Sequence, residues 1–282
     1  MHIVVMVDME GISGICRKSQ VRPDGEHYQG ARRYMTWDAN ACVDGCFRGG
    51  AKRVTVRDAH GSGFNFVWDE LDPRAVYAQG AGRRGPRLPD IEKADGLILL
   101  GYHAMAGVPE AILEHTMSSV EWQNSWLNGR KAGEVAIDAG AAGDHGVPTI
   151  MVSGDDKVCR EARRLIKGVV AVEVKRGLDL EYGVLLPKAV AHERIRAGAA
   201  RAVRRGRAIR PFRVAHPVRM RRELVSRGVV PVGRPGVRAI DGRTYEVSGP
   251  TVEAALRLLC GWQAIELFSA RQPRGIGGGA QE

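Results

Sequence analysis

The sequence predicts an α/β fold in which a mainly parallel central sheet is flanked by helices, with a smaller α+β elaboration towards the C-terminus. The first half of the 282-residue chain alternates short apolar runs with longer mixed segments, the pattern of strands joined by helical crossovers. Most runs are continuous stretches of β-branched residues or leucine, as is usual for strands buried on both faces. The composition, 44% hydrophobic and 26% charged, excludes the disordered, collagen-like and coiled-coil classes.

The expected strands of the central sheet are all short. They cover residues 3–7, 53–56, 76–78, 96–100 and 148–152. Helices are expected between them, over residues 28–49, 133–144 and 156–167. Gly49 and Gly50 should end the first helix, and Asp155 or Asp156 should cap the last one.

Turn residues mark a loop and a hairpin in the same half of the chain. Residues 81–89, AGRRGPRLP, are rich in Gly, Pro and Arg, and we expect an exposed loop there. Residues 120–127 are strand-like and precede Asn128 and Gly129, a dipeptide that favours tight hairpin turns. A β-hairpin is therefore expected at that point.

Beyond about residue 168 the pattern changes to short strands around one long helix. The expected elements are a strand over residues 169–174, an Arg-rich helix over 189–207, short strands up to 247, and an apolar helix over 251–268. We therefore expect an α/β region, residues 1–168, and an α+β region, residues 169–270, packed on it. Residues 271–282 are expected to form a disordered tail.

Cysteine usage and the lack of long apolar runs point to a reducing, aqueous environment. The five cysteines are an odd number spread along the chain, which favours free thiols over a disulfide framework. Cys42 and Cys46 are one helical turn apart, and a buried helix face explains them better than a zinc knuckle. No run approaches the about 20 apolar residues that cross a bilayer, and acidic residues come too early for a secretory signal. We expect a soluble cytoplasmic protein with no membrane partner.

The formal net charge of +10 comes mainly from arginine, which is densest around residues 201–214, RAVRRGRAIRPFRV. Such runs occur in nucleic-acid-binding proteins, but this one lacks interleaved aromatic residues and any zinc-finger spacing. Residues 189–207 also carry Ala and Val at helical spacing among the arginines, which is typical of a solvent-facing amphipathic helix. A nucleic-acid partner is therefore not expected.

Charged side chains follow three of the expected strands at the point where each strand ends. Asp8 follows the first strand and Glu10 lies two residues later, so both side chains point to one side while the chain stays extended. Asp58 and His60 follow the second strand, and His103 follows the fourth. Because ligands of open α/β sheets collect beyond the carboxyl ends of the strands, we expect these groups to face one site.

This cluster predicts a metal site. Like-charged carboxylates repel one another unless protons or cations compensate them. Imidazole and carboxylate donors without cysteine favour zinc or another divalent transition metal in a partly open catalytic site. Glu134, at the start of a helix, offers a further oxygen. These donors exceed the needs of one open zinc site, so two metals about 3.5–4 Å apart are expected, with Asp8 as the bridging ligand. Residues 1–168 would then be the metal-binding catalytic region.

Each of these residues has an ordinary structural explanation when it is taken alone. An Asp after a strand often caps a helix or forms a turn, which accounts for Asp155 and Asp156 and serves equally well for Asp8 by itself. A single histidine is more often a surface or core residue than a ligand. That explanation covers His2, His27, His145, His192 and His216. The convergence of three strand ends is what distinguishes His60 and His103.

Six short motifs resemble those of a known enzyme family. They are VDMEGISGI (7–15), RDAHGSG (57–63), LGYHAMAG (100–107), EHTM (114–117), GEVAIDAG (133–140) and VSGDD (152–156). In their order and spacing they are similar to the motifs of the D-aminopeptidase family, the M55 metallopeptidases. The resemblance covers about residues 1–160.

The resemblance implies a zinc-dependent aminopeptidase that acts on short peptides with an N-terminal D-amino acid such as D-alanine. Two zinc ions per subunit would be held by Asp8, Glu10, His60, His103 and Glu134, which the strand ends had already indicated. The family's catalytic histidine corresponds to His115, as acid or base or as nucleophile, and the strand ends alone do not single it out. The family likeness also suggests a homo-oligomer, such as a decameric ring, with active sites facing an inner chamber.

Two other functions stay open on the sequence alone. A binuclear metal-dependent phosphoesterase would use the same kind of site. Against it, the sequence contains neither a Gly-Asn-His-Asp motif nor a glycine-rich phosphate cradle. An Arg-rich nucleic-acid-binding protein would make the strand-end cluster incidental, and it would show steeply salt-dependent binding without stoichiometric metal.

Overall fold

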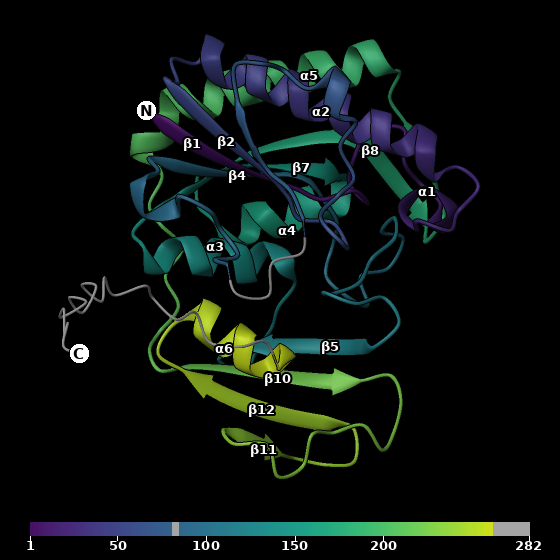
Figure 1. The fold of residues 1–282 in the computed structure, drawn as a ribbon, viewed down its shortest axis with the longest axis vertical. Coiled ribbons are helices and arrows are strands. Elements are labelled where there is room, and N and C mark those ends of the chain that lie inside the picture. Colours follow the sequence, from purple (N-terminus) through teal and green to yellow (C-terminus); the bar gives the residue numbers. More distant parts are fainter. Residues whose placement is uncertain (81–84, 262–282) are drawn as a thin grey trace, which may run out of the picture.

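The larger of two β-sheets forms the centre of the molecule. The computed structural model describes residues 1–80 and 85–261. The strands of this sheet, in spatial order, are β3 (Val76–Ala78), β2 (Arg53–Asp58), β1 (His2–Val7), β4 (Gly96–Tyr102), β7 (Thr149–Asp155), β8 (Val170–Asp179) and β9 (Tyr182–Leu185) (Figure 1). Neighbouring strands are parallel except for β8 and β9, which pair antiparallel. The expected α/β class with a mainly parallel central sheet is confirmed.

Helices cover both faces of this sheet. On one face, α2 (Tyr28–Arg48) packs against α5 (Lys188–Arg205), and on the other lie α3 (Glu134–Asp144) and α4 (Asp156–Leu165) (Figure 1). Every residue of β1 is buried. Its side chains alternate between two cores, because Ile3, Val5 and Val7 pack with the α2 and α5 side and Val4 and Met6 pack with the α3 side. Burial on both faces therefore explains the continuous apolar run of the first strand.

The smaller sheet is antiparallel and packs below α3 in Figure 1. Its strands, in spatial order, are β11 (Val237–Ala239), β12 (Thr244–Gly249), β10 (Val218–Leu224), β5 (Trp122–Leu127) and β6 (Arg130–Lys131). The helix α6 (Val252–Cys260) contacts β10, β12 and α3. Strands β5 and β6 precede residue 168, and β8 and β9 follow it although they belong to the larger sheet. The sheets therefore do not divide the chain at a single residue.

The Asn-Gly turn joins β5 to β6 as expected. Asn128 and Gly129 have φ angles of 47° and 82°, the left-handed conformation that a tight hairpin turn requires. Leu127 pairs with Arg130 across the turn. On its other side β5 pairs with β10, so the hairpin begins the smaller sheet.

Helix ends follow the residues that the sequence indicated. Asp155 caps α4 by accepting hydrogen bonds from the backbone N–H groups of Lys157 and Val158. Gly50, with a φ of 99°, adopts the left-handed conformation just after α2.

Cys42 and Cys46 are buried on α2, as expected. The Arg-rich helix α5 buries a stripe of small and apolar side chains against the protein, which confirms the amphipathic interpretation.

Some expectations are corrected and others fall outside the described residues. Gly85 and Pro86 are exposed, as expected for a loop, but Leu88 is buried and Arg87 nearly so, which corrects the expectation for those two residues. Residues 81–84 of that loop, residues 262–268 of the expected last helix, and the expected tail, residues 271–282, lie outside the described part of the chain. Elements that the sequence did not indicate are α1 (Lys18–Val21), β9 and three short 3-10 helices, Trp68–Glu70, Ile91–Lys93 and Gly206–Ala208. None of the helices among the described residues combines the length and hydrophobicity that a bilayer crossing requires.

Candidate metal centre

The carboxyl ends of β1, β2 and β4 bring the candidate ligands together. β1 lies between β2 and β4, with Val7 opposite Asp58 on one side and opposite Leu100 on the other. The Asp8 backbone N–H donates to Leu100 O at 2.9 Å, which extends the ladder one residue beyond the strand. The Ala59 N–H likewise donates to Val7 O at 2.8 Å. The three strand ends therefore deliver their side chains to one edge, as the sequence predicts.

A close backbone approach holds the segment between Asp8 and Glu10 against β4. The Gly11 N–H donates to Gly101 O at 2.7 Å. A Cβ on Gly11 would lie 2.0 Å from Tyr102 O, so only glycine fits this position. This contact turns the chain directly after Glu10 and keeps both carboxylates at the sheet edge.

Asp8 lies between two histidines. One of its carboxylate oxygens is 3.2 Å from His60 Nδ1, and the other is 3.3 Å from His103 Nε2. His60 Nδ1 is also 3.1 Å from Glu10 Oε2. On the other side, His103 Nε2 is 3.2 Å from Glu134 Oε1. The five residues predicted as ligands thus form one continuous cluster.

His115 joins the same cluster. Its Nε2 is 3.9 Å from Glu134 Oε1, and its ring stacks on that of His103. Among the described residues, two groups have donor atoms within 4.8 Å of one another: Asp8, Glu10 and His103, and His103, His115 and Glu134. The structure therefore places the predicted catalytic histidine within the range of metal donors.

Backbone carbonyls fix the orientation of all three imidazoles. His60 Nε2 donates to Val21 O at 2.7 Å, His103 Nδ1 to Ala104 O at 3.0 Å, and His115 Nδ1 to Leu113 O at 2.9 Å. A carbonyl oxygen only accepts, so the ring nitrogen that faces it carries the hydrogen. In each neutral ring the other nitrogen then presents its lone pair to the acidic cluster. This is the arrangement in which metal-binding histidines are commonly held.

Concentrated negative charge changes the pKa values of these groups. Burial lowers the pKa of His60, but Glu10 and Asp8 outweigh it and raise that pKa well above its ordinary value. Burial also lowers the pKa of His103, but the adjacent carboxylates of Asp8 and Glu134 outweigh it and raise that pKa well above the ordinary value. Burial raises the pKa values of Asp8 and Glu134, but the neighbouring histidines outweigh it, so that the pKa of Asp8 is held well below its usual range and that of Glu134 is lowered to about 2. Positive charge therefore stabilises the cluster, and imidazole protons or a metal ion can supply it.

The donor set fits a zinc site. Its atoms are imidazole nitrogens and carboxylate oxygens, which zinc prefers together with thiolates. His103 Nε2 is fully buried and has no hydrogen-bond partner among the described residues, although it points at two carboxylates. A buried nitrogen in that situation is usually satisfied by a hydrogen bond or by a metal.

Asp58 has a supporting position. It is buried and accepts hydrogen bonds from the backbone N–H of Asn65, at 2.5 Å, and from the Asn65 side-chain amide. The same amide donates to His60 O at 2.8 Å. Asp58 thus closes the loop that carries His60, and it belongs to neither group of donors.

Three charged residues that the sequence did not indicate hold the segments around the cluster. The buried Lys175 donates to Glu10 O, Ile12 O and Ile15 O at 2.5, 2.9 and 2.6 Å, and burial lowers its pKa to about 8. Arg87 pairs with Asp138 and lies 3.6 Å from Glu134 Oε2. In the sequence, Lys175 is marked only as an isolated Lys in the apolar run of β8. Arg87 is marked only through its partner Asp138, which lies four residues after Glu134 on the same helix.

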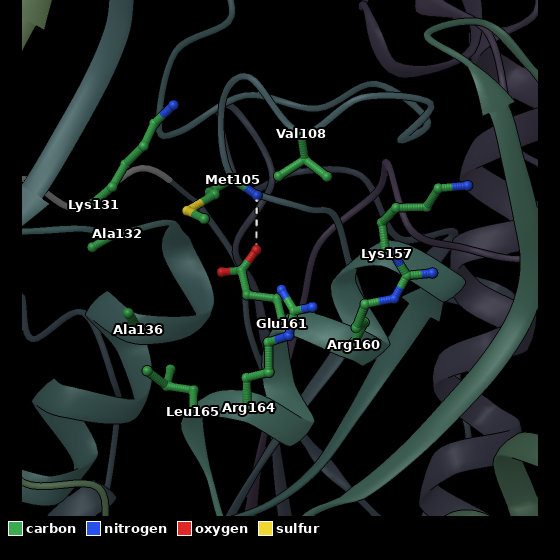
Figure 2. Close-up of a pocket in the computed structure, with 10 residues that line it drawn as sticks. All are labelled: Met105, Val108, Lys131, Ala132, Ala136, Lys157, Arg160, Glu161, Arg164 and Leu165. Atoms are coloured by element: carbon green, nitrogen blue, oxygen red, sulfur yellow. Dashed lines mark hydrogen bonds between the residues drawn. The ribbon is translucent and has the colours of Figure 1, made fainter.

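Glu161 is the third of these residues. Its Oε2 accepts a hydrogen bond from the Met105 backbone N–H at 3.0 Å, two residues after His103 (Figure 2). A Cβ on Gly133, just before Glu134, would lie 3.0 Å from Glu161 Oε1 and 2.5 Å from Met105 Cβ. Glu161 lines a cavity of about 250 Å³ to which residues of α3 and α4 also contribute. Figure 2 shows Arg160 and Arg164 beside Glu161. The segments that carry His103 and Glu134 therefore meet at this carboxylate.

A larger cavity opens at the cluster itself. It has a volume of about 500 Å³, and Glu10 and His115 contribute to its wall. The side chain of His115 is 14% exposed, whereas that of His103 is 1% exposed. His115 is therefore the more accessible of the two stacked histidines.

Comparisons with known proteins agree with the resemblance seen in the motifs. A family model described as D-aminopeptidase, peptidase M55, matches residues 1–260. A D-aminopeptidase from Bacillus subtilis (strain 168) is 33% identical over 180 residues, which are 64% of this chain and 65% of that relative, just under two thirds of its length. The structure of the zinc-dependent D-aminopeptidase DppA from Bacillus subtilis, described as a self-compartmentalizing protease, matches with a TM-score of 0.88 at 27% identity. That match covers 93% of this chain and 96% of that chain.

Proposed function

The chain belongs to the D-aminopeptidase family of peptidases, M55, and on that premise we propose that it is a zinc-dependent aminopeptidase. Its substrates are short peptides with an N-terminal D-amino acid such as D-alanine. The observation that carries the proposal is the common orientation of His60, His103 and His115. Each is held by a backbone carbonyl so that its second nitrogen faces one or two carboxylates of the same cluster. The similarity to a zinc-dependent D-aminopeptidase supports zinc as the metal.

Two zinc ions are proposed for each subunit, held by Asp8, Glu10, His60, His103 and Glu134. Asp8 is the candidate shared ligand because its two oxygens face two different histidines. Glu10 accompanies His60 on one side of it, and Glu134 accompanies His103 on the other. Bound zinc would polarise the scissile carbonyl and lower the pKa of a water molecule.

His115 is the proposed proton carrier of the reaction. Its Nδ1–H is bound to Leu113 O, so Nε2 is the atom that exchanges a proton with the substrate. Its position in the wall of the larger cavity brings Nε2 within reach of a leaving amine. Stacking on His103 and the short distance to Glu134 restrict the rotation of the ring.

The lining of the cavity supports a preference for a free amino terminus. Glu114 lines the cavity and is not among the proposed zinc ligands, so its carboxylate favours a protonated amine over an internal amide. An internal peptide segment carries no such charge. Aminopeptidase action is therefore proposed in preference to cleavage within a chain.

Metal analysis combined with matched substrates tests this function. Purified protein should retain about two zinc ions per chain by inductively coupled plasma mass spectrometry, and it should hydrolyse D-alanyl-glycine faster than L-alanyl-glycine. Protein that holds no stoichiometric metal and cleaves neither peptide would contradict the proposal. Cleavage of p-nitrophenyl phosphate without cleavage of either peptide would identify a phosphoesterase instead.

We also propose that the protein assembles as a ring-like homo-oligomer. The support is the similarity to a protein described as a self-compartmentalizing protease. A chamber would restrict access to short peptides, which is consistent with the proposed substrates. Native mass spectrometry should give a closed oligomer, and a monomer at micromolar concentration would contradict the assembly without affecting the metal site.

A further inference from the structure

The larger cavity beside the cluster carries charges of both signs. Glu10 and Glu114 contribute carboxylates to it, and Lys18 and Arg22 contribute cationic side chains. Apolar side chains, those of Leu113, Val120, Leu180 and Val225, also line it. A ligand with a positive group, a negative group and a small apolar body would match this lining.

The cations belong to a segment that His60 holds in place. His60 Nε2 donates to Val21 O at 2.7 Å, and Arg22 is the next residue, with its Cα about 3.8 Å further along the chain. Lys18 lies about one helical turn before it. Glu10, His115 and both cations line one cavity of about 500 Å³, a size that holds a small ligand, so a short peptide in it can contact the cluster and these side chains together.

The present partners of the two cations are weak and exchangeable. Lys18 Nζ lies 3.8 Å from Glu181, with side chains 52% and 41% exposed. Arg22 Nε lies 3.4 Å from Asp24, with side chains 62% and 76% exposed. Ion pairs exposed to this degree contribute little stability. Both cations can therefore turn towards a ligand carboxylate at small cost.

We propose that Lys18 and Arg22 bind the C-terminal carboxylate of the substrate, so that the enzyme selects zwitterionic di- and tripeptides. This inference rests on the proposed aminopeptidase function and deepens it. The metal-holding cluster and Glu114 take the amino end of the peptide, and the α1 segment takes its carboxyl end. A longer peptide would carry its terminal carboxylate past the two cations and lose the contact.

A pair of substrates that differ only in the terminal charge tests the inference. D-alanyl-glycine and D-alanyl-glycinamide are compared on the zinc-loaded wild-type protein and on the double variant Lys18→Met/Arg22→Gln. The matched control is Arg17→Gln, which removes a neighbouring exposed cation that does not line the cavity. The charge-conserving variant Lys18→Arg/Arg22→Lys tests whether charge at these positions is sufficient.

The wild-type protein should show a kcat/KM about tenfold higher for the free acid than for the amide. The two substrates should differ in KM rather than in kcat. The ratio should fall towards one in the double variant, and it should persist in the control and in the charge-conserving variant. A ratio near one in the wild type, or an unchanged ratio in the double variant, would overturn the inference while leaving the aminopeptidase function intact. Hydrolysis of neither substrate by wild-type protein would instead overturn the proposed function, and the carboxylate site with it.

Discussion

The imidazole rings of His103 and His115 lie parallel and in contact, with centroids 3.9 Å apart and planes 11° from each other. Their second nitrogens both face Glu134, although the two residues are held by different backbone carbonyls. One of these histidines is enclosed and the other lines the cavity. This difference assigns His103 to metal binding and His115 to proton transfer in the proposed mechanism.

Replacing His115 with Ala should separate these two roles. Zinc content should remain near the wild-type value, because the five proposed ligands stay in place, while kcat falls by about 10²–10⁴-fold. Metal analysis and steady-state kinetics on one preparation measure both quantities. The exposed His145, replaced by Ala, is the control and should change neither. A variant that loses its zinc together with its activity would place His115 among the ligands instead.

Replacing Asp8 with Asn should remove zinc and activity together. The neutral amide keeps the size of the side chain but cannot balance two metal ions or hold both histidines as a carboxylate does. Zinc stoichiometry after dialysis and turnover of D-alanyl-glycine are the measurements. Asp24→Asn, at an exposed position, provides the comparison. Full zinc content and full turnover in the Asp8 variant would exclude the bridging role.

Removing the metal should lower the thermal stability of the protein. Clustered carboxylates and histidines lose the charge that compensates them, and a ligand present at about 100 times its Kd contributes about 2.7 kcal/mol. For a chain of 282 residues, that corresponds to a Tm decrease of about 5 °C. Differential scanning calorimetry with a chelator, followed by addition of zinc, measures the change. A Tm that is the same with and without chelator would argue against a resident metal.

Glu161 should act on zinc affinity through the segment that follows His103. Glu161→Ala removes the acceptor of the Met105 N–H, and we expect zinc affinity to fall by about tenfold. Glu161→Gln keeps an acceptor of the same length and should stay within about twofold of the wild type. Arg160→Ala, on the same helix, is the control, and competition with a zinc-binding dye gives the affinities. Equal affinities for the Ala variant and the wild type would remove Glu161 from the support of the site.

The same carboxyl group should make stability depend on pH. Burial raises the pKa of Glu161 above its ordinary value near 4.5. Between that value and the raised one, the folded protein binds more protons than the unfolded chain, so the free energy of unfolding falls as pH rises. Wild-type protein should therefore lose stability relative to Glu161→Gln as the pH rises above about 4.5, as urea unfolding of zinc-free protein would measure. Glu92→Gln, at an exposed position, is the control, and a pH-independent difference for Glu161→Gln would contradict the effect.

The site could be anticipated from the sequence where it depends on strand ends. Asp8, His60 and His103 each follow a buried apolar run, and adjacent parallel strands necessarily bring their carboxyl ends to one edge. Glu134 was indicated by its place at the start of a helix. His115 was indicated by family resemblance alone, because it lies in a loop whose course depends on contacts such as that between the Ile112 N–H and Asp155.

The supporting charges could not be anticipated in the same way. Lys175 lies about 160 residues from the carbonyls that it binds, and Glu161 lies 56 residues from Met105. Nothing in the periodicity of β8 or α4 identifies such partners. Arg87 even appeared to lie in an exposed loop, because Gly, Pro and Arg in a short segment are common at surfaces.

The sequence by itself determined the α/β class, the β5–β6 hairpin and the edge of the sheet at which the chemistry gathers. These features follow from local patterns: continuous apolar runs for strands buried on both faces, and an Asn-Gly pair for a tight turn. Only the tertiary structure decided that β5 pairs with β10 in a second sheet, that His115 stacks on His103, and that α1 lies against His60. Such pairings depend on packing between segments far apart in the chain, and many segments have the same local pattern, so the pattern does not specify which of them meet.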